Sequence, residues 1–283
     1  MTSPGPRRLG VVTATLTVAA SMVGTGVFTT TGYLVADIGS PIAVLIAWAV
    51  GGVVALAGAL CYAELGAMIP ENGGEYTLID RVWHPSLGFV AAVISIVVGF
   101  AAPIAAASLA FAAYVRAAWP TLPVDDRVLA VGLVAVGAGI HATRVHLGAA
   151  ALNVVTAIQL ATVAAVLAVG IALGDVANLG AGPPVAAAVA SPAFAVGLVY
   201  VGFSYAGWNA AAYLAGELRD PHATLPRALG IGTVAVTVLY VGLNAGILMA
   251  APPSTLAGAP EVAHTAAVAV LGPRGGQVLS AVV

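Results

Sequence analysis

The sequence contains very little charge. Only 7% of its 283 residues are charged, whereas soluble domains carry about 25%. It has no lysine, and all nine basic residues are arginine. The net charge of −2 provides no basic surface for nucleic acid, so we expect no nucleic-acid partner. A chain that is 61% hydrophobic, with so few charges, is expected to be surrounded by lipid.

Cysteine and catalytic groupings are also scarce. The single Cys61 excludes a disulfide framework within the chain, and its apolar surroundings predict a buried structural thiol. We find no Ser/His/Asp grouping, phosphate-binding loop or pair of carboxylates. His141 and His146 flank Arg144 at a spacing of five, whereas zinc-binding helices space their histidines by four. We therefore expect no enzyme activity, no cofactor and no bound metal.

Long apolar runs dominate what is present. A helix needs about 20 apolar residues to cross a bilayer, and its backbone polar groups are paired within the helix. The runs are longer than barrel strands and do not alternate. The sequence therefore predicts an all-α polytopic membrane protein, with part of an eighth span starting near Ala266. The seven complete spans are predicted at Leu9–Ala36, Pro41–Met68, Leu87–Trp119, Val128–His141, Leu147–Gly174, Ala193–Gly216 and Leu229–Ala251.

The arginines predict the orientation of these spans. Cytoplasmic loops of membrane proteins carry an excess of basic residues. With the N-terminus inside, the inner segments hold Arg7, Arg8, Arg81, Arg144, Arg219 and Arg227. The outer segments hold Arg116, Arg127 and Arg274. We expect a multi-pass protein of the cytoplasmic membrane, with residues 1–8 as a cytoplasmic tail.

Two spans contain glycine clusters near their centres. The first span has Gly24 and Gly26, and the sixth has Gly202 and Gly207. Glycine permits unusual backbone dihedrals, and broken helices in a bilayer occur only where they line a cavity. Broken helices expose N–H groups on one half and C=O groups on the other, which suits an amino-acid zwitterion. Close helix packing is an alternative explanation for the glycines.

Three segments carry a family resemblance. They read MVGTGVF at 22–28, YAELGAMIPENGGEY at 62–76 and FSYAGWNAAAYLAGELRDPHATLPRAL at 203–229. In this order they resemble the amino acid–polyamine–organocation (APC) superfamily, and within it bacterial permeases of the L-amino-acid transporter type. The resemblance implies an inverted five-helix repeat fold. The first repeat would cover 9–174, an extracytoplasmic linker 175–192, and an incomplete second repeat 193–283. We therefore expect the chain to be C-terminally truncated.

The resemblance also implies a substrate site. Backbone amides at the positions matching Thr25 and Gly26 hold the substrate carboxylate in the family. Carbonyls at the positions matching Met22, Phe203 and Ala206 hold the ammonium, and Phe203 also matches a gating position. The other candidates for substrate contact are Gly24, Ser204, Tyr205, Gly207 and Trp208.

Two features of the sixth span and its following loop leave alternatives open. Trp208 either contacts the substrate or has a packing or lipid-interface role. A charged cluster follows the span and either contributes ion pairs to an inner gate or is a solvated loop. The cluster consists of Glu217, Arg219, Asp220 and Arg227.

Gln159 occupies the fifth-span position at which proton-coupled members of the family carry lysine. Because glutamine cannot cycle a proton at physiological pH, lysine-based proton coupling is not expected. The leading interpretation is a secondary transporter that moves neutral L-amino acids by alternating access through the lipid bilayer. A polyamine or organic-cation carrier is one alternative, although the centres of spans 1, 3 and 6 contain no acid. A transport-inactive fragment of a permease is the other.

Overall fold

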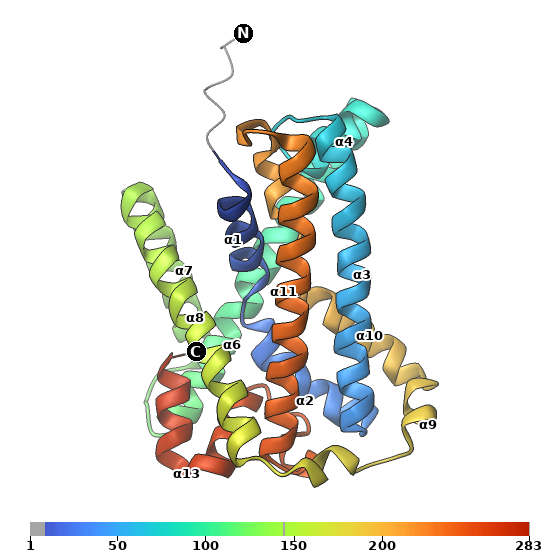
Figure 1. Cartoon of the computed structure of the whole chain (residues 1–283). Coiled ribbons are helices and arrows are strands. Elements are labelled where there is room, and N and C mark those ends of the chain that lie inside the picture. Colours follow the sequence, from blue (N-terminus) through green and yellow to red (C-terminus); the bar gives the residue numbers. More distant parts are fainter. Residues whose placement is uncertain (1–8, 144, 283) are drawn as a thin grey trace. The chain divides into compact units, whose positions relative to one another are not determined.

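The structure is a computed structural model that describes residues 9–143 and 145–282. The predicted tail 1–8, with Arg7 and Arg8, lies outside the described residues, as do Arg144 and the side chains of His141 and His146. Every regular element of the described part is helical, apart from one isolated β-bridge between Leu9 and Leu218 (Figure 1). The predicted all-α polytopic membrane fold is confirmed.

The helices follow the apolar runs because lipid offers the backbone no other hydrogen-bond partners. In chain order they are α1 (Val11–Met22), α2 (Gly26–Ile38), α3 (Pro41–Met68), α4 (Glu75–Val82), α5 (Pro85–Ile94), the π-helical η1 (Ser95–Ala101), α6 (Ala102–Ala118), α7 (Asp126–Thr143), α8 (Val145–Leu173), the 3₁₀ segment η2 (Val176–Gly180), α9 (Val185–Val189), α10 (Pro192–Ser204), the 3₁₀ segment η3 (Ala210–Glu217), α11 (Pro221–Ala250), α12 (Pro253–Leu256) and α13 (Val262–Val282).

Three helical stretches of the described part are long and apolar enough to cross a membrane. They are Pro41–Met68, Pro85–Ala118 and Pro221–Ala250, and α1 with α2 makes a fourth if the pair is one broken span. The second of these stretches comprises α5, η1 and α6. The positions of these stretches agree with the predicted spans, whereas the total of seven complete spans stays a prediction.

The helix predicted to start near Ala266 as an eighth span is interrupted. Within α13 the chain turns at Gly272, whose φ is 74° and ψ −179°. Pro273 follows, and its fixed φ suits the first turn of a new helix. His264 Nδ1 lies 3.0 Å from the Gly276 carbonyl and 2.7 Å from Ser280 Oγ, whereas a straight helix separates residues 16 apart by about 24 Å. The prediction of one continuous helix here is therefore wrong.

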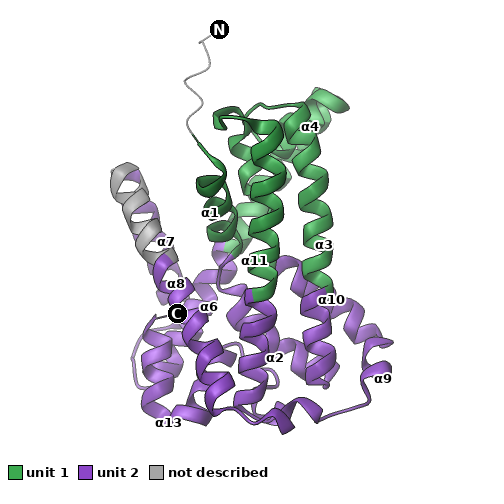
Figure 2. Cartoon of the chain, in the orientation of Figure 1, with its two compact units in different colours: residues 1–22, 50–103, 205–238 green, residues 23–49, 104–204, 239–283 purple. Residues whose placement is uncertain are grey.

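The chain divides into two compact units (Figure 2). Unit 1 comprises residues 1–22, 50–103 and 205–238, and unit 2 comprises residues 23–49, 104–204 and 239–283. The boundaries fall inside α3, α6 and α11, after Met22 and after Ser204. Since both units draw on separate stretches of chain, they do not correspond to the predicted repeats, and that division of the sequence stays a prediction.

Apolar side chains lie on both sides of the long helices. On α3, Val53 and Val54 are 66% and 65% exposed, because lipid solvates such groups and leaves little hydrophobic force between helices. Cys61 is exposed as well, so the prediction of a buried thiol is wrong. Where helices do pack, small residues allow close approach: a Cβ on Gly52 of α3 would overlap Thr237 of α11 in unit 1.

Candidate substrate site

The first predicted span is interrupted where its glycines lie. α1 ends at Met22 and α2 begins at Gly26, so Val23, Gly24 and Thr25 are not part of either helix. Thr25 is the N-cap residue of α2, and its side chain makes no capping hydrogen bond. The first N–H groups of a helix have no partner within it and form a ready site for an anion. The predicted break is confirmed, and the exposed amides suit a carboxylate.

In unit 2 the start of α2 packs against the end of α10. A Cβ on Gly26 would lie 3.1 Å from Ser204 Oγ and 3.3 Å from Ser204 Cα. The Ser204 hydroxyl donates to the Tyr200 carbonyl at 3.1 Å, so it accepts the 2.8 Å hydrogen bond from Thr30 Oγ1. Glycine at position 26 therefore allows the α2 amides and a buried hydroxyl to approach closely.

The predicted sixth span is interrupted as well. α10 ends at Ser204, a turn covers residues 205–209, and η3 continues the chain from Ala210. Gly207 has a φ of 105°, a conformation that side-chain-bearing residues rarely adopt. In unit 1 a Cβ on Gly207 would overlap the Ser21 carbonyl near the end of α1. This glycine therefore lets the turn lie directly against α1.

Trp208 packs against α3 in unit 1. A Cβ on Gly58 would be only 2.8 Å from the Trp208 ring. The rings of Trp208 and Tyr62 meet edge to face, with centroids 5.1 Å apart. Such aromatic pairs contribute about 0.5–1.5 kcal/mol beyond the burial of their surface. These contacts favour the packing role for Trp208 over direct contact with substrate.

Buried hydrogen bonds hold α2 in unit 2. Thr31 donates to the side-chain oxygen of Asn244 and accepts a 3.0 Å hydrogen bond from Trp48 Nε1. All three residues are fully buried. The Tyr114 hydroxyl also donates to the Phe28 carbonyl at 2.8 Å. A buried polar network whose members are paired fixes the geometry of the elements it joins, so the amide end of α2 has a rigid support.

Two further sequence candidates, Phe203 and Gln159, lie partly exposed on helices. Phe203 is 48% exposed at the end of α10, and Gln159 is partly exposed on α8. Among the described residues, the ion pairs join Arg81 to Glu71 and Arg116 to Asp126. The charged cluster predicted for an inner gate forms no ion pair in the described part of the chain, which favours a solvated loop. Its members are Glu217, Arg219, Asp220 and Arg227.

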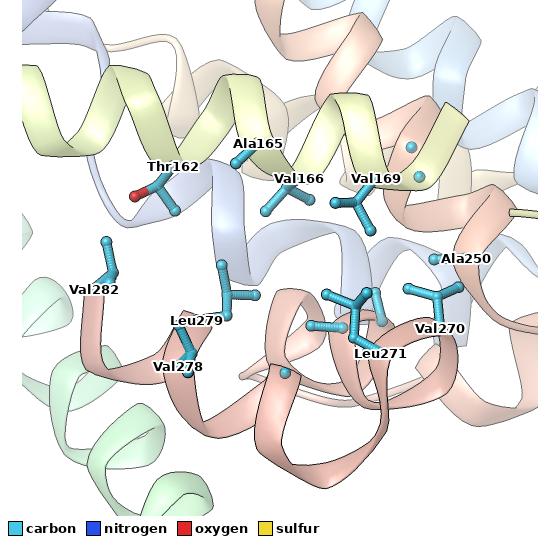
Figure 3. A pocket seen from close by; sticks show the side chains of 15 residues that line it. Thr162, Ala165, Val166, Val169, Ala250, Val270, Leu271, Val278, Leu279 and Val282 are labelled. Atoms are coloured by element: carbon cyan, nitrogen blue, oxygen red, sulfur yellow. The ribbon is translucent and has the colours of Figure 1, made fainter. Parts of the chain in front are cut away.

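Unit 2 also contains an apolar cavity of about 210 Å³, lined by α8, α11 and α13 (Figure 3). Among the described lining residues, the only side-chain oxygen belongs to Thr162, whose hydroxyl donates to the Ile158 carbonyl at 2.9 Å. The charged groups of an amino acid would find no side-chain partner there, and leaving them unpaired is costly. This cavity is therefore not a candidate for the substrate site.

Sequence reasoning missed two contacts around the interrupted spans. One joins Thr30 to Ser204, and the other joins Asn209 to Glu75, whose Oε1 lies 3.3 Å from Asn209 Nδ2. The first left a weak signal, because Thr30 lies one helical turn after Gly26 and therefore on the same face of α2. The second left none, since Asn209 lies in the turn after α10, 134 residues from Glu75 at the start of α4.

Apolar helices that are interrupted by glycine are typical of multi-pass membrane proteins of the transporter class. The chain belongs to the amino acid permease family, because the family model described as "Amino acid permease" matches residues 9–283.

Curated relatives agree with this assignment. The chain is 32% identical over 271 residues to the b(0,+)-type amino acid transporter 1 of Mus musculus, covering 92% of this chain and 54% of the relative. It is 30% identical to the large neutral amino acids transporter small subunit 2 of Mus musculus, with 94% and 52% coverage. The serine/threonine exchanger SteT of Bacillus subtilis is 28% identical, with 97% and 62% coverage. The chain thus spans about half to three fifths of the length of these relatives.

Proposed function

We propose that this protein is a secondary transporter that carries neutral L-amino acids across the cell membrane. The amides of Thr25 and Gly26 bind the substrate carboxylate, and the carbonyls of Met22, Phe203 and Ala206 bind its ammonium. The observation that carries the proposal is the break before α2, which leaves amides available beside the Ser204 hydroxyl. Helix N-termini bind anions in this way, and half-helices of transporters present them to anionic substrate groups.

The choice of a neutral substrate follows from the interrupted segments. Residues 23–25 and 205–209 contain no acidic or basic side chain, so these segments offer no charged partner to a charged side chain of the substrate. The names of the relatives point to large neutral amino acids and to serine and threonine as the first substrates to test. An organic-cation carrier is the second candidate, because the structure places the acid Glu75 against Asn209.

The transport cycle is proposed to be alternating access, with the N-terminus in the cytoplasm. Six arginines in the predicted inner segments against three in the outer ones support that orientation. Gln159 in place of a titratable lysine supports exchange or facilitated uptake rather than lysine-based proton coupling. Rocking of one helix bundle against another around a fixed site is the motion that related folds use.

Gly26→Val tests the carboxylate site. The branched side chain would meet Ser204 at a point where even a Cβ lies 3.1 Å from Oγ, and it would obstruct the amides. We expect saturable uptake of labelled L-leucine and L-serine into proteoliposomes to be lost. These amino acids should also protect the purified protein less well against heating. The concentration needed for protection should rise at least about tenfold, because a hydrogen bond to a charged group contributes about 1.5–3 kcal/mol.

Gly132→Val is the matched control. Gly132 lies on α7, and a Cβ there would have no atom within 4 Å. This variant should keep uptake and stabilisation by substrate. Gly26→Ala, a smaller change at the site, should show an intermediate loss. Normal uptake kinetics in Gly26→Val, in a protein that elutes as a folded species, would show that the carboxylate binds elsewhere. Uptake of diamines in preference to neutral amino acids would favour the organic-cation carrier.

A further inference from the structure

Unit 1 contains a cavity of about 250 Å³ that the proposed transport site does not use. Its lining comes from the loop before α4, from the start of α4, from α5, from the π-helical segment η1 and from η3. Glu75, Tyr76, Ser95, Phe100 and Tyr213 contribute its polar and aromatic side chains. π-helical turns are rare and occur frequently at functional sites. Here the π-helical geometry presents both Ser95 and Phe100 to the same cavity.

Among the described residues that line this cavity, Glu75 is the only carboxylate. Asn209 Nδ2 lies 3.3 Å from its Oε1 and 3.4 Å from its Oε2, and the Tyr213 hydroxyl interacts with it as well. Both donors are neutral. The arginines of the described ion pairs bind Glu71 and Asp126 instead. The negative charge of Glu75 therefore has no cationic partner among the described residues.

Aromatic rings lie around the same cavity. Phe100 and Tyr213 meet edge to face with their centroids 6.2 Å apart, and Tyr76 belongs to the lining too. The Tyr213 ring is held against the backbone at Gly74, where a Cβ would lie 2.6 Å from Cε1. A φ of 57° at Gly74 allows this approach. A carboxylate next to aromatic faces is the arrangement that attracts an organic ammonium ion.

We propose that this cavity binds a small organic cation through its ammonium group. Glu75 supplies the counter-charge, and the rings of Tyr76, Phe100 and Tyr213 supply cation–π contacts. The cavity is smaller than the roughly 300–1,000 Å³ of most ligand pockets, so the ligand is an alkylammonium group of a few carbons. A soluble amine and the ethanolamine head group of a lipid share this chemistry.

The test measures binding rather than transport, so its result does not depend on whether the proposed transport function is correct. Purified protein is placed in nanodiscs of phosphatidylglycerol, and labelled putrescine is titrated at equilibrium. We expect saturable binding that excess L-leucine does not displace. The titration is repeated in nanodiscs that contain phosphatidylethanolamine. Weaker putrescine binding there means that the lipid head group competes for the cavity, and unchanged putrescine binding means that the cavity takes soluble amines. Both outcomes support an ammonium site.

Two pairs of variants locate the binding. Glu75→Gln keeps the size of the side chain and an acceptor for Asn209, and should weaken putrescine binding by at least about tenfold because the charged partner is lost. Glu71→Gln, in the loop just before α4 but paired with Arg81, should bind normally. Phe100→Leu should weaken binding about threefold through the lost ring face, whereas Phe89→Leu, at an exposed position of α5, should not.

Three results would overturn the proposal. The first is the absence of saturable putrescine binding in folded protein in both kinds of nanodisc. The second is equal affinity in Glu75→Gln and the parent protein. The third is full displacement of putrescine by L-leucine, which would place the amine at the proposed transport site.

Discussion

Gly207→Ala is the most direct test of the interrupted sixth span, because the added methyl group should destabilise the protein in two independent ways. The φ of 105° at Gly207 is outside the regions that alanine adopts readily, and left-handed backbone costs about 1–2 kcal/mol for residues with a Cβ. The new Cβ would also overlap the Ser21 carbonyl within unit 1. Overpacking of this kind costs about 1–3 kcal/mol. Together the two terms predict a loss of about 2–5 kcal/mol.

The loss can be measured as thermal stability. Since 1 kcal/mol shifts Tm by about 2–4 °C in chains of 150–250 residues, the purified variant should lose roughly 4–20 °C, measured as the folded fraction by size exclusion after heating in detergent. Gly202→Ala is the matched control, because it lies on α10 with no atom within 4 Å of a Cβ. Alanine favours helix over glycine by up to about 1 kcal/mol, so this control should be unchanged or slightly more stable. Equal melting of Gly207→Ala and the parent protein would refute the turn at 205–209.

Two further predictions concern coupling and the predicted outer loop. With Gln159 in place of lysine, uptake of neutral amino acids into proteoliposomes should be unchanged when a pH gradient is imposed, and an obligatory dependence on inward proton flow would contradict this. Arg116→Lys should lower stability by about 1–2 kcal/mol, read as a lower Tm. Arg116 donates to Asp126 at 2.7 Å and to the carbonyls of Leu122 and Val124, and a lysine cannot match this fork of donors. An unchanged Tm would show that these contacts do not hold the loop.

The sequence predicted the helices and their interruptions well, because strong physical constraints apply to both. Lipid forces an apolar run to be helical, and the α3 bounds Pro41–Met68 are those of the predicted second span. Gly24, Gly26 and Gly207 weaken helices in the middle of long runs, and both predicted breaks are present in the structure.

The errors have equally specific causes. Cys61 was predicted to be buried from its apolar neighbours, but in lipid an apolar environment is also found on the outside of a helix. The helix predicted from Ala266 was judged by hydropathy, which does not register that Gly272 followed by Pro273 ends one helix and begins another. The contact of Glu75 with Asn209 depends on tertiary folding, and no local pattern in either segment indicates it.

The interleaving of the two units has a consequence for how the protein is made. Unit 1 takes residues 1–22, 50–103 and 205–238, so its early segments leave the ribosome long before α11 exists to pack against α3. Contacts between segments far apart in sequence form late, since loop closure must precede them. The early hydrophobic segments must therefore remain inserted without their contacts to residues 205–238 while more than 100 further residues are synthesised. Slowing translation before residue 205 should lengthen the interval in which these helices are open to quality-control proteases.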